Sequence, residues 1–129
     1  SVKDLRQLAL GGIHISTRLQ RSLCRAIGDH AHLESVNLAD TGLGNTYVTR
    51  ECITSLLSSR SMKTLDLGWN CFNHEVFECL GRLLSENNRL RSLYVDNCSA
   101  SVEEAVTPIS LFLELLAHNS GLARLSVAL

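Results

Sequence analysis

One hexapeptide pattern recurs five times along the chain and constrains its fold more than any other feature. Each copy reads L-x-x-L-x-L, with other aliphatic residues in place of leucine at some positions. The copies begin at Leu5, Leu33, Met62, Leu90 and Leu122, so successive starts are 28, 29, 28 and 32 residues apart. A period of this length is typical of repeat architectures, in which each unit buries its apolar residues against its neighbours.

Each repeat has the pattern of one strand followed by one helix. The final residues of every hexapeptide alternate between leucine-type and other side chains, which predicts a short strand with one buried face. Between the strands, apolar residues form two matched columns four residues apart, which predicts amphipathic helices. The first column is Leu23, Cys52, Leu80 and Phe112, and the second is Ile27, Leu56, Leu84 and Leu116.

Residues that favour helix N-termini precede the predicted helices: Ser16 or Thr17, Thr46 or Thr49, and Asn73. The four additional residues of the fourth repeat fall within 101–115. There, Ser101 to Glu104 has the form of a capping box, and Pro108 interrupts a straight helix. We expect a short turn over 102–106 and a helix over about 108–118, with a single kinked helix as the alternative.

A second spacing recurs in the turn after each predicted strand. Five residues past the first four hexapeptides lie Ile15, Leu43, Phe72 and Ala100, which we expect to be buried. Two residues earlier lie Ile13, Thr41, Asn70 and Cys98. A polar side chain at this second position can satisfy backbone groups that the bend leaves unpaired. Asn70 and Cys98 fit this role and Thr41 is a plausible substitute, whereas Ile13 indicates an atypical first repeat.

These repeats resemble the leucine-rich repeat family, and their alternating 28- and 29-residue spacing resembles its ribonuclease-inhibitor-like subclass. The resemblance runs from Leu5 to Leu129 and implies an α/β solenoid, a horseshoe arc with a parallel sheet on the concave face and helices on the convex face. We expect residues 1–129 to form a single array of about four and a half repeats. Because the sequence starts and stops on a strand without a polar capping segment, we expect a longer array, or open ends covered by neighbouring repeats or another chain.

Composition argues against several classes of function. Twelve Lys and Arg balance thirteen Asp and Glu, for a formal net charge of -1, so we expect no nucleic-acid partner. No apolar run approaches the roughly 18 residues of a membrane helix, so we expect no membrane partner. The five cysteines are an odd number and include no C-x-x-C pair. Free thiols in an intracellular, reducing compartment are therefore the prediction, with a cytoplasmic location.

The sequence offers no pattern typical of catalysis. Five histidines are scattered, and His30 and His32 bracket a helix-to-strand turn but lack the carboxylate or thiol company of a metal pair. Asp66 and Asp96 lie on neighbouring predicted strands, but an open, wet surface does not tune carboxylates for acid–base work. We therefore expect no enzyme activity, no catalytic residues, no metal site and no cofactor.

Strand alternation selects the residues that face the concave side. On the third and fourth strands these include Asp66, Tyr94 and Asp96. Beside them lie the only tryptophan, Trp69, and the flanking residues Asp40 and Asn97. Exposed aromatic residues are common anchors of protein interfaces, and carboxylates select a basic partner. In the resembled subclass, such residues commonly contact protein ligands.

We therefore predict a binding site made of Asp40, Asp66, Trp69, Tyr94, Asp96 and Asn97. The predicted insertion near Ser101–Thr107 falls on the same rim. The alternative interpretation is that Trp69 folds over the rim onto Phe72 and that the aspartates are merely solvated.

The expected function is a non-catalytic scaffold that binds a protein partner, through a basic surface on that partner. The resemblance leaves two alternatives open. One is an interior structural segment of a large sensor or of a cytoskeletal or ciliary assembly protein. The other, supported only by the shared repeats, is a regulator of a small GTPase.

Overall fold

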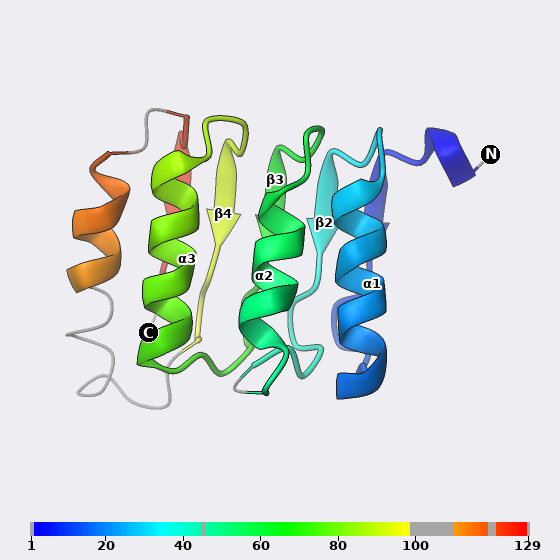
Figure 1. Ribbon diagram of the computed structural model, residues 1–129, viewed down its shortest axis with the longest axis horizontal. Helices are drawn as coiled ribbons and strands as arrows, with labels where there is room; N and C mark the ends of the chain where they lie inside the picture. The colour runs from blue at the N-terminus through cyan, green and yellow to red at the C-terminus, as the bar shows by residue number, and fades with distance from the viewer. Residues whose placement is uncertain (1, 45, 99–109, 119–120, 129) are drawn as a thin grey trace.

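The computed structural model describes residues 2–44, 46–98, 110–118 and 121–128. Short strands alternate with longer helices along these residues (Figure 1). The elements are η1 (Val2–Asp4), β1 (Gln7–Ala9), α1 (Thr17–Asp29), β2 (Ser35–Asn37), α2 (Thr49–Leu57), β3 (Thr64–Asp66), α3 (His74–Glu86), β4 (Ser92–Tyr94) and β5 (Arg124–Ser126). Residues 110–116 form a further helical segment.

The five strands form one parallel sheet in chain order, β1-β2-β3-β4-β5. Equivalent residues of the hexapeptides lie opposite one another, as the repeat alignment predicts. The central positions form one row across the sheet: Leu8, Val36, Leu65, Leu93 and Leu125. The helices lie side by side over one face of the sheet (Figure 1). This arrangement confirms the predicted α/β architecture, in which the sheet forms one layer and the helices the other.

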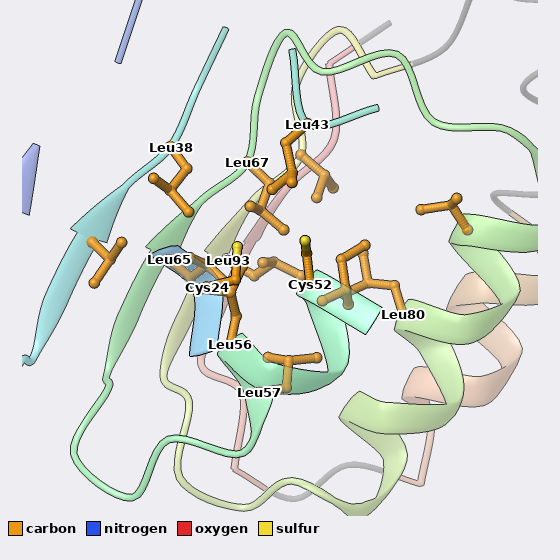
Figure 2. Packing of buried hydrophobic residues seen from close by; sticks show 14 of the residues in the cluster. Cys24, Leu38, Leu43, Cys52, Leu56, Leu57, Leu65, Leu67, Leu80 and Leu93 are labelled. Atoms are coloured by element: carbon orange, nitrogen blue, oxygen red, sulfur yellow. The ribbon is translucent and has the colours of Figure 1, made fainter. Parts of the chain in front are cut away.

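The core is a continuous apolar layer between the sheet and the helices (Figure 2). Leu65 and Leu93 contribute to it from the sheet, and Leu56 and Leu80 from the helices, each 0% exposed. The predicted helix columns line this layer, although Leu23 and Leu116 at their two ends are only partly buried. Since no strand–helix unit could bury its own apolar stripe, contact between neighbouring repeats is what creates the core.

The turns after the strands are held by buried polar side chains. Asn70 is 2% exposed, and its Oδ1 accepts hydrogen bonds from the backbone N–H of Thr41 (3.2 Å) and of Leu43 (3.0 Å). Its Nδ2 donates to the carbonyl oxygens of Leu38 (2.9 Å) and Leu67 (3.0 Å). Asn70 thus satisfies backbone groups of its own repeat and of the preceding one, as predicted.

The equivalent positions of the neighbouring repeats act in a similar but weaker way. The Thr41 hydroxyl donates to the Leu38 carbonyl at 2.8 Å, and the Cys98 thiol donates to the Leu67 carbonyl at 3.2 Å. Ile13 is 55% exposed, which confirms that the first repeat departs from the others. Of the expected buried residues, Leu43 and Phe72 are buried, Ile15 is half-buried and Ala100 lies outside the described residues.

A second set of side chains organises the turns that precede the strands, a role that the sequence analysis missed. In three successive repeats, a side chain accepts hydrogen bonds from the backbone N–H groups two and three residues later. The residues are His30, through Nδ1, Ser59, through Oγ, and Asn87, through Oδ1. Three chemically different acceptors fill one role, so no residue type repeats and periodicity could not reveal it. His30 is therefore a turn residue.

The predicted helix starts are correct in part. Asn73 caps α3, where its side chain accepts from the N–H of Val76 at 2.9 Å. Ser16 is the N-cap of α1, but its side chain makes no capping hydrogen bond. The prediction for α2 is wrong, because Val48 is its N-cap and Thr49 its first residue. There the Thr49 hydroxyl accepts from the N–H of Thr46 at 3.0 Å and so stabilises the preceding loop instead.

The predicted turn over 102–106, the capping box at Ser101 and the position of Pro108 lie outside the described residues. The helical segment at 110–116 falls inside the helix expected over 108–118. None of the helices described is long and apolar enough to cross a membrane. All five cysteines are free; Cys24, Cys52 and Cys98 are buried, Cys79 is half-buried and Cys71 is exposed.

Candidate protein-binding rim

The edge of the sheet where the strands end is built on a repeated left-handed turn. Three residues past the ends of β1 to β4, the backbone has a positive φ at Gly12 (81°), Asp40 (52°), Trp69 (58°) and Asn97 (55°). We call these four residues the C-terminal rim. Glycine, aspartate and asparagine adopt this conformation readily, whereas it is unfavourable for a bulky side chain. Trp69 is therefore the exception among the four.

The backbone of the C-terminal rim is fixed by hydrogen bonds that continue the parallel ladder beyond the strands. The N–H of Asp40 donates to the carbonyl of Gly68 at 2.9 Å, and that of Trp69 donates to the carbonyl of Asp96 at 2.7 Å. The N–H of Asn97 donates in the same way to the carbonyl of Ala128 at 2.6 Å. Consecutive rim residues are thus held at the spacing of adjacent strands, about 4.8 Å.

Trp69 presents its side chain to solvent, with an exposed fraction of 65%. Phe72, onto which it could have folded, is 4% exposed and packs edge-on against Phe77, with ring centroids 5.9 Å apart. Among the described residues, no ring contact joins Trp69 to Phe72 or to another aromatic side chain.

The two aspartates of the predicted site also shape their own turns. Asp66 Oδ1 accepts a hydrogen bond from the N–H of Gly68 at 2.9 Å. Asp96 Oδ1 accepts from the N–H of Ala128 at 2.7 Å and from the Ser126 hydroxyl at 2.6 Å. Within the described part of the chain, Oδ2 of Asp66 and of Asp96 has no hydrogen-bond partner. Each carboxylate is thus oriented by one oxygen and can meet a partner through the other.

A cation that the sequence analysis did not assign to the site lies beside Tyr94. The Arg124 guanidinium donates to the Tyr94 hydroxyl at 3.4 Å, and this hydrogen bond raises the pKa of the fully exposed Arg124. Arg124 stands on the concave row that the strand alternation predicts, but only the register between β4 and β5 places it against Tyr94. The carboxylates of the site therefore lie at the ends of β2, β3 and β4, and Arg124 adds a positive charge on β5.

All six predicted site residues occupy adjacent places on the central strands β3 and β4 or in the turns after β2, β3 and β4. Asp66 lies opposite Tyr94 in the sheet, while Asp40, Trp69 and Asn97 follow on consecutive turns. Another exposed aromatic residue, Tyr47, is 85% exposed and lies in the loop before α2, at the same edge of the molecule. Neither strand alternation nor the helix columns include that loop, so the sequence analysis had no signal for Tyr47.

The chemistry of this edge is that of recognition. It combines exposed aromatic surface, oriented carboxylates and a rigid backbone, and the thiol of Cys98 lies buried behind them, where burial raises its pKa to about 12. Among the described residues, no group of three or more histidine, cysteine, aspartate or glutamate side chains could hold a metal ion.

Comparison with solved structures identifies the architecture. The chain superimposes on the C-terminal domain of Caenorhabditis elegans tropomodulin with a TM-score of 0.83 and 21% identity, covering 98% of this chain and 75% of that one. It superimposes on the actin-binding site 2 of leiomodin-1 with a TM-score of 0.82 and 15% identity, covering 98% and 72%. The fold is a leucine-rich repeat solenoid. At these identities the structural likeness establishes the fold alone.

Sequence comparison leads to the same class of repeat. The leucine-rich repeat-containing protein 45 of Gallus gallus is 34% identical over 106 residues, which is 82% of this chain. The chain spans 15% of the length of that relative. No protein-family model matches the chain.

Proposed function

We propose that this leucine-rich repeat chain is a non-catalytic module that binds a protein partner through the C-terminal rim and the adjoining open face of the sheet. The residues in contact are Asp40, Asp66, Trp69, Tyr94, Asp96 and Asn97. The partner offers a basic surface to the aspartates and an apolar or cationic group to the indole of Trp69. The 28- and 29-residue spacing further supports assignment to the ribonuclease-inhibitor-like subclass, and the five free thiols support a reducing cytoplasmic location.

The conformation of Trp69 is the observation that carries this proposal. A tryptophan with φ of 58° and 65% exposure gains little from burial and occupies an unfavourable region of backbone space. The equivalent positions after β1, β2 and β4 hold glycine, aspartate and asparagine, which tolerate the turn. Unfavourable conformations that persist in a rigid frame are concentrated at functional sites.

Rigidity explains how such a site would bind. The ladder hydrogen bonds fix the rim before a partner arrives, so little backbone entropy is lost on association. The binding free energy would come mainly from Trp69 and Tyr94, because aromatic anchors dominate protein interfaces. The aspartates would determine which partner is accepted and how quickly it associates.

The test is an affinity capture with the immobilised chain, comparing the wild type with the double variant Trp69→Ala/Tyr94→Ala. We expect the double variant to lose the specific partner, at least about tenfold in retained protein, since each anchor typically contributes more than about 1 kcal/mol. Circular dichroism should show unchanged folding. The matched control is Leu19→Ala/Leu113→Ala, which removes two exposed apolar side chains from helical segments.

A second double variant tests how much the negative charges of the site contribute to partner binding. Asp66→Asn/Asp96→Asn keeps the Oδ1 acceptors that hold the turns and removes both negative charges. It should weaken capture and reduce its dependence on salt. Undiminished capture by the aromatic double variant, or an equal loss in the helix control, would contradict the proposal.

A second candidate function is that of an interior structural segment in a large assembly protein. It is favoured by the length of the chicken relative, of which this chain spans 15%. In that case the end strands β1 and β5, which are less buried than β2 to β4, would be the contact surfaces. Concentration-dependent association in sedimentation experiments, unaffected by the Trp69 and Tyr94 substitutions, would support this candidate over the first.

A further inference from the structure

The opposite edge of the sheet, where the helices end and the strands begin, carries a groove lined by cations. This edge is at the top of Figure 1. The groove has a volume of about 340 Å³, and its charged side chains are five cations and one carboxylate: Arg6, Arg60, Lys63, Arg89, Arg91 and Glu34. Ser61, Asn88 and the apolar residues Ala31 and Met62 complete its lining. We call it the basic groove.

Only one of these cations is neutralised within the described residues. Glu34 pairs with Arg6 at 3.4 Å, and both side chains are about half exposed. Arg60, Lys63 and Arg89 are exposed and have no carboxylate partner in the part of the chain that the structure describes. With Arg91 they leave four unpaired positive charges along one groove, in a chain whose formal net charge is -1.

The positions of these cations are fixed by the repeat. The N–H of Lys63 donates to the Glu34 carbonyl and the N–H of Arg91 to the Lys63 carbonyl, both at 2.8 Å. Glu34, Lys63 and Arg91 thus lie side by side, each directly before a strand. Ser59 and Asn87 hold the turns that carry Arg60 and Arg89. The Arg91 guanidinium is itself oriented, because Nη1 donates to the carbonyls of Asn88 (3.1 Å) and Gly121 (2.7 Å).

We propose that the basic groove binds an acidic segment of a protein, with its carboxylates spaced to meet Arg60, Lys63, Arg89 and Arg91. Guanidinium groups pair with carboxylates through two parallel hydrogen bonds, which gives direction as well as attraction. The exposed Ala31 adds a small apolar surface between the cations, and the buried Met62 closes the groove beneath it. The molecule would thus join two partners of opposite charge at its two edges.

The lining favours a protein segment over other anions. No aromatic side chain lines the groove, so single-stranded bases would have no stacking platform. Four unpaired cations on a nearly neutral chain are few for a duplex or an anionic membrane, both of which carry dense, extended charge. A short run of glutamates or aspartates matches the groove in charge and in length.

A simpler explanation is that the cations only stabilise the negative ends of the helices. However, α1, α2 and α3 have no basic residue in their last turn, where that effect is concentrated. The cations lie beyond the helix ends, in the turns and at the strand starts. This explanation also predicts that removing them lowers stability, so a stability measurement separates it from the proposal.

The test measures binding of a fluorescein-labelled, glutamate-rich peptide by fluorescence anisotropy, with the glutamine version of the peptide as the probe control. The variant Arg60→Glu/Arg89→Glu should bind at least about tenfold more weakly, because two attractive pairs become repulsive. The control variant Arg18→Glu/Arg50→Glu makes the same change in net charge on exposed helix residues outside the groove. It should retain binding to within about twofold, and both variants should melt as the wild type does.

Several outcomes would overturn the proposal. Equal binding of the glutamine peptide, or an equal loss in both charge variants, would mean that the groove itself recognises nothing. Tighter, Arg60-dependent binding of duplex DNA or of phosphatidylserine vesicles would assign the groove to a different class of ligand. Salt-sensitive self-association abolished both by Arg60→Glu/Arg89→Glu and by Asp66→Asn/Asp96→Asn would assign it to a second copy of the chain. The Trp69→Ala/Tyr94→Ala variant should bind the peptide normally, which keeps this test separate from that of the rim.

Discussion

Trp69 combines two properties that rarely coincide in one residue, a left-handed backbone and a mostly exposed bulky side chain. The left-handed conformation costs roughly 1–2 kcal/mol in a residue with a Cβ, and less in asparagine or aspartate, whose side chains can bond locally. Asp40 and Asn97 hold the equivalent positions in the flanking repeats. The sequence of the chain therefore already contains the replacement that the backbone would favour.

The substitution Trp69→Asn is predicted to leave stability unchanged or to raise it by up to about 1 kcal/mol while weakening partner capture. Relief of the left-handed strain should at least offset the small loss of packing from a side chain that is 65% exposed. Urea unfolding followed by circular dichroism measures the stability. A loss of more than about 1 kcal/mol would show that Trp69 is a structural residue, and the argument for its role in binding would fail.

At the scale of the elements, the turns on both sides of each strand decide how consecutive repeats join. Asn70 connects its own repeat to the preceding one through backbone groups of both. Close approach matters equally between α1 and α2, where a Cβ at Gly28 would collide with the carbonyl oxygen of Ser55. Polar turns and glycine contacts therefore set the spacing of the repeats, while the leucines fill the space between sheet and helices.

Replacement of Asn70 by alanine should destabilise the fold by about 2–4 kcal/mol, because several buried backbone groups would lose their partners together. Asn70→Thr and Asn70→Cys are the matched variants, since Thr41 and Cys98 occupy this position in the neighbouring repeats. Each should recover part of the loss. Threonine can donate to the Leu67 carbonyl of its own repeat, as Thr41 does to that of Leu38, and cysteine to the Leu38 carbonyl of the preceding repeat, as Cys98 does to that of Leu67. Chemical denaturation compares the three variants. Equal stability of Asn70→Ala and the wild type would refute the role assigned to this side chain.

Across the whole molecule, the five cysteines differ in burial and fall into three classes: buried, half-buried and exposed. Cys24, Cys52 and Cys98 are each 1% exposed. Cys24 of α1 and Cys52 of α2 lie in the core between these helices and the sheet (Figure 2). A hydrogen bond with Cys52, followed by burial, raises the pKa of the Cys24 thiol. Burial raises the pKa of Cys98 to about 12. The same hydrogen bond with Cys24 lowers the pKa of Cys52, but its thiol is shielded from solvent like those of Cys24 and Cys98, whereas Cys71 is exposed.

We therefore expect thiol labelling at pH 8 to show an ordered response. Cys71 should react first with Ellman's reagent and half-buried Cys79 more slowly, while the other three should react only on unfolding. Cys71→Ser should remove the fast phase and leave the slow phases in place. Labelling of Cys24 or Cys98 in the native protein at the rate of Cys71 would mean that the stacked core opens far more readily than its packing implies.

The hexapeptides by themselves determined the parallel sheet, its strand order and the face that each strand residue occupies. A period close to 28 residues leaves stacking in register as the only way to bury Leu65, Leu93 and their equivalents. Asn70 and the cap at Asn73 were also predictable, because their residue types recur at such turns. In each of these cases the interaction that decides the structure is either local in sequence or recurs once in every repeat of about 28 residues.

Some features depend on which side chains become neighbours in space, and their residue types do not recur from repeat to repeat. Only the tertiary structure decided these features. His30, Ser59 and Asn87 share one turn role with three different side chains, and Arg124 meets Tyr94 only because β4 and β5 pair in register. The basic groove likewise combines turn residues and strand starts that are far apart in the chain. A sequence pattern records the period of the backbone, whereas a surface site depends on which side chains that period brings together.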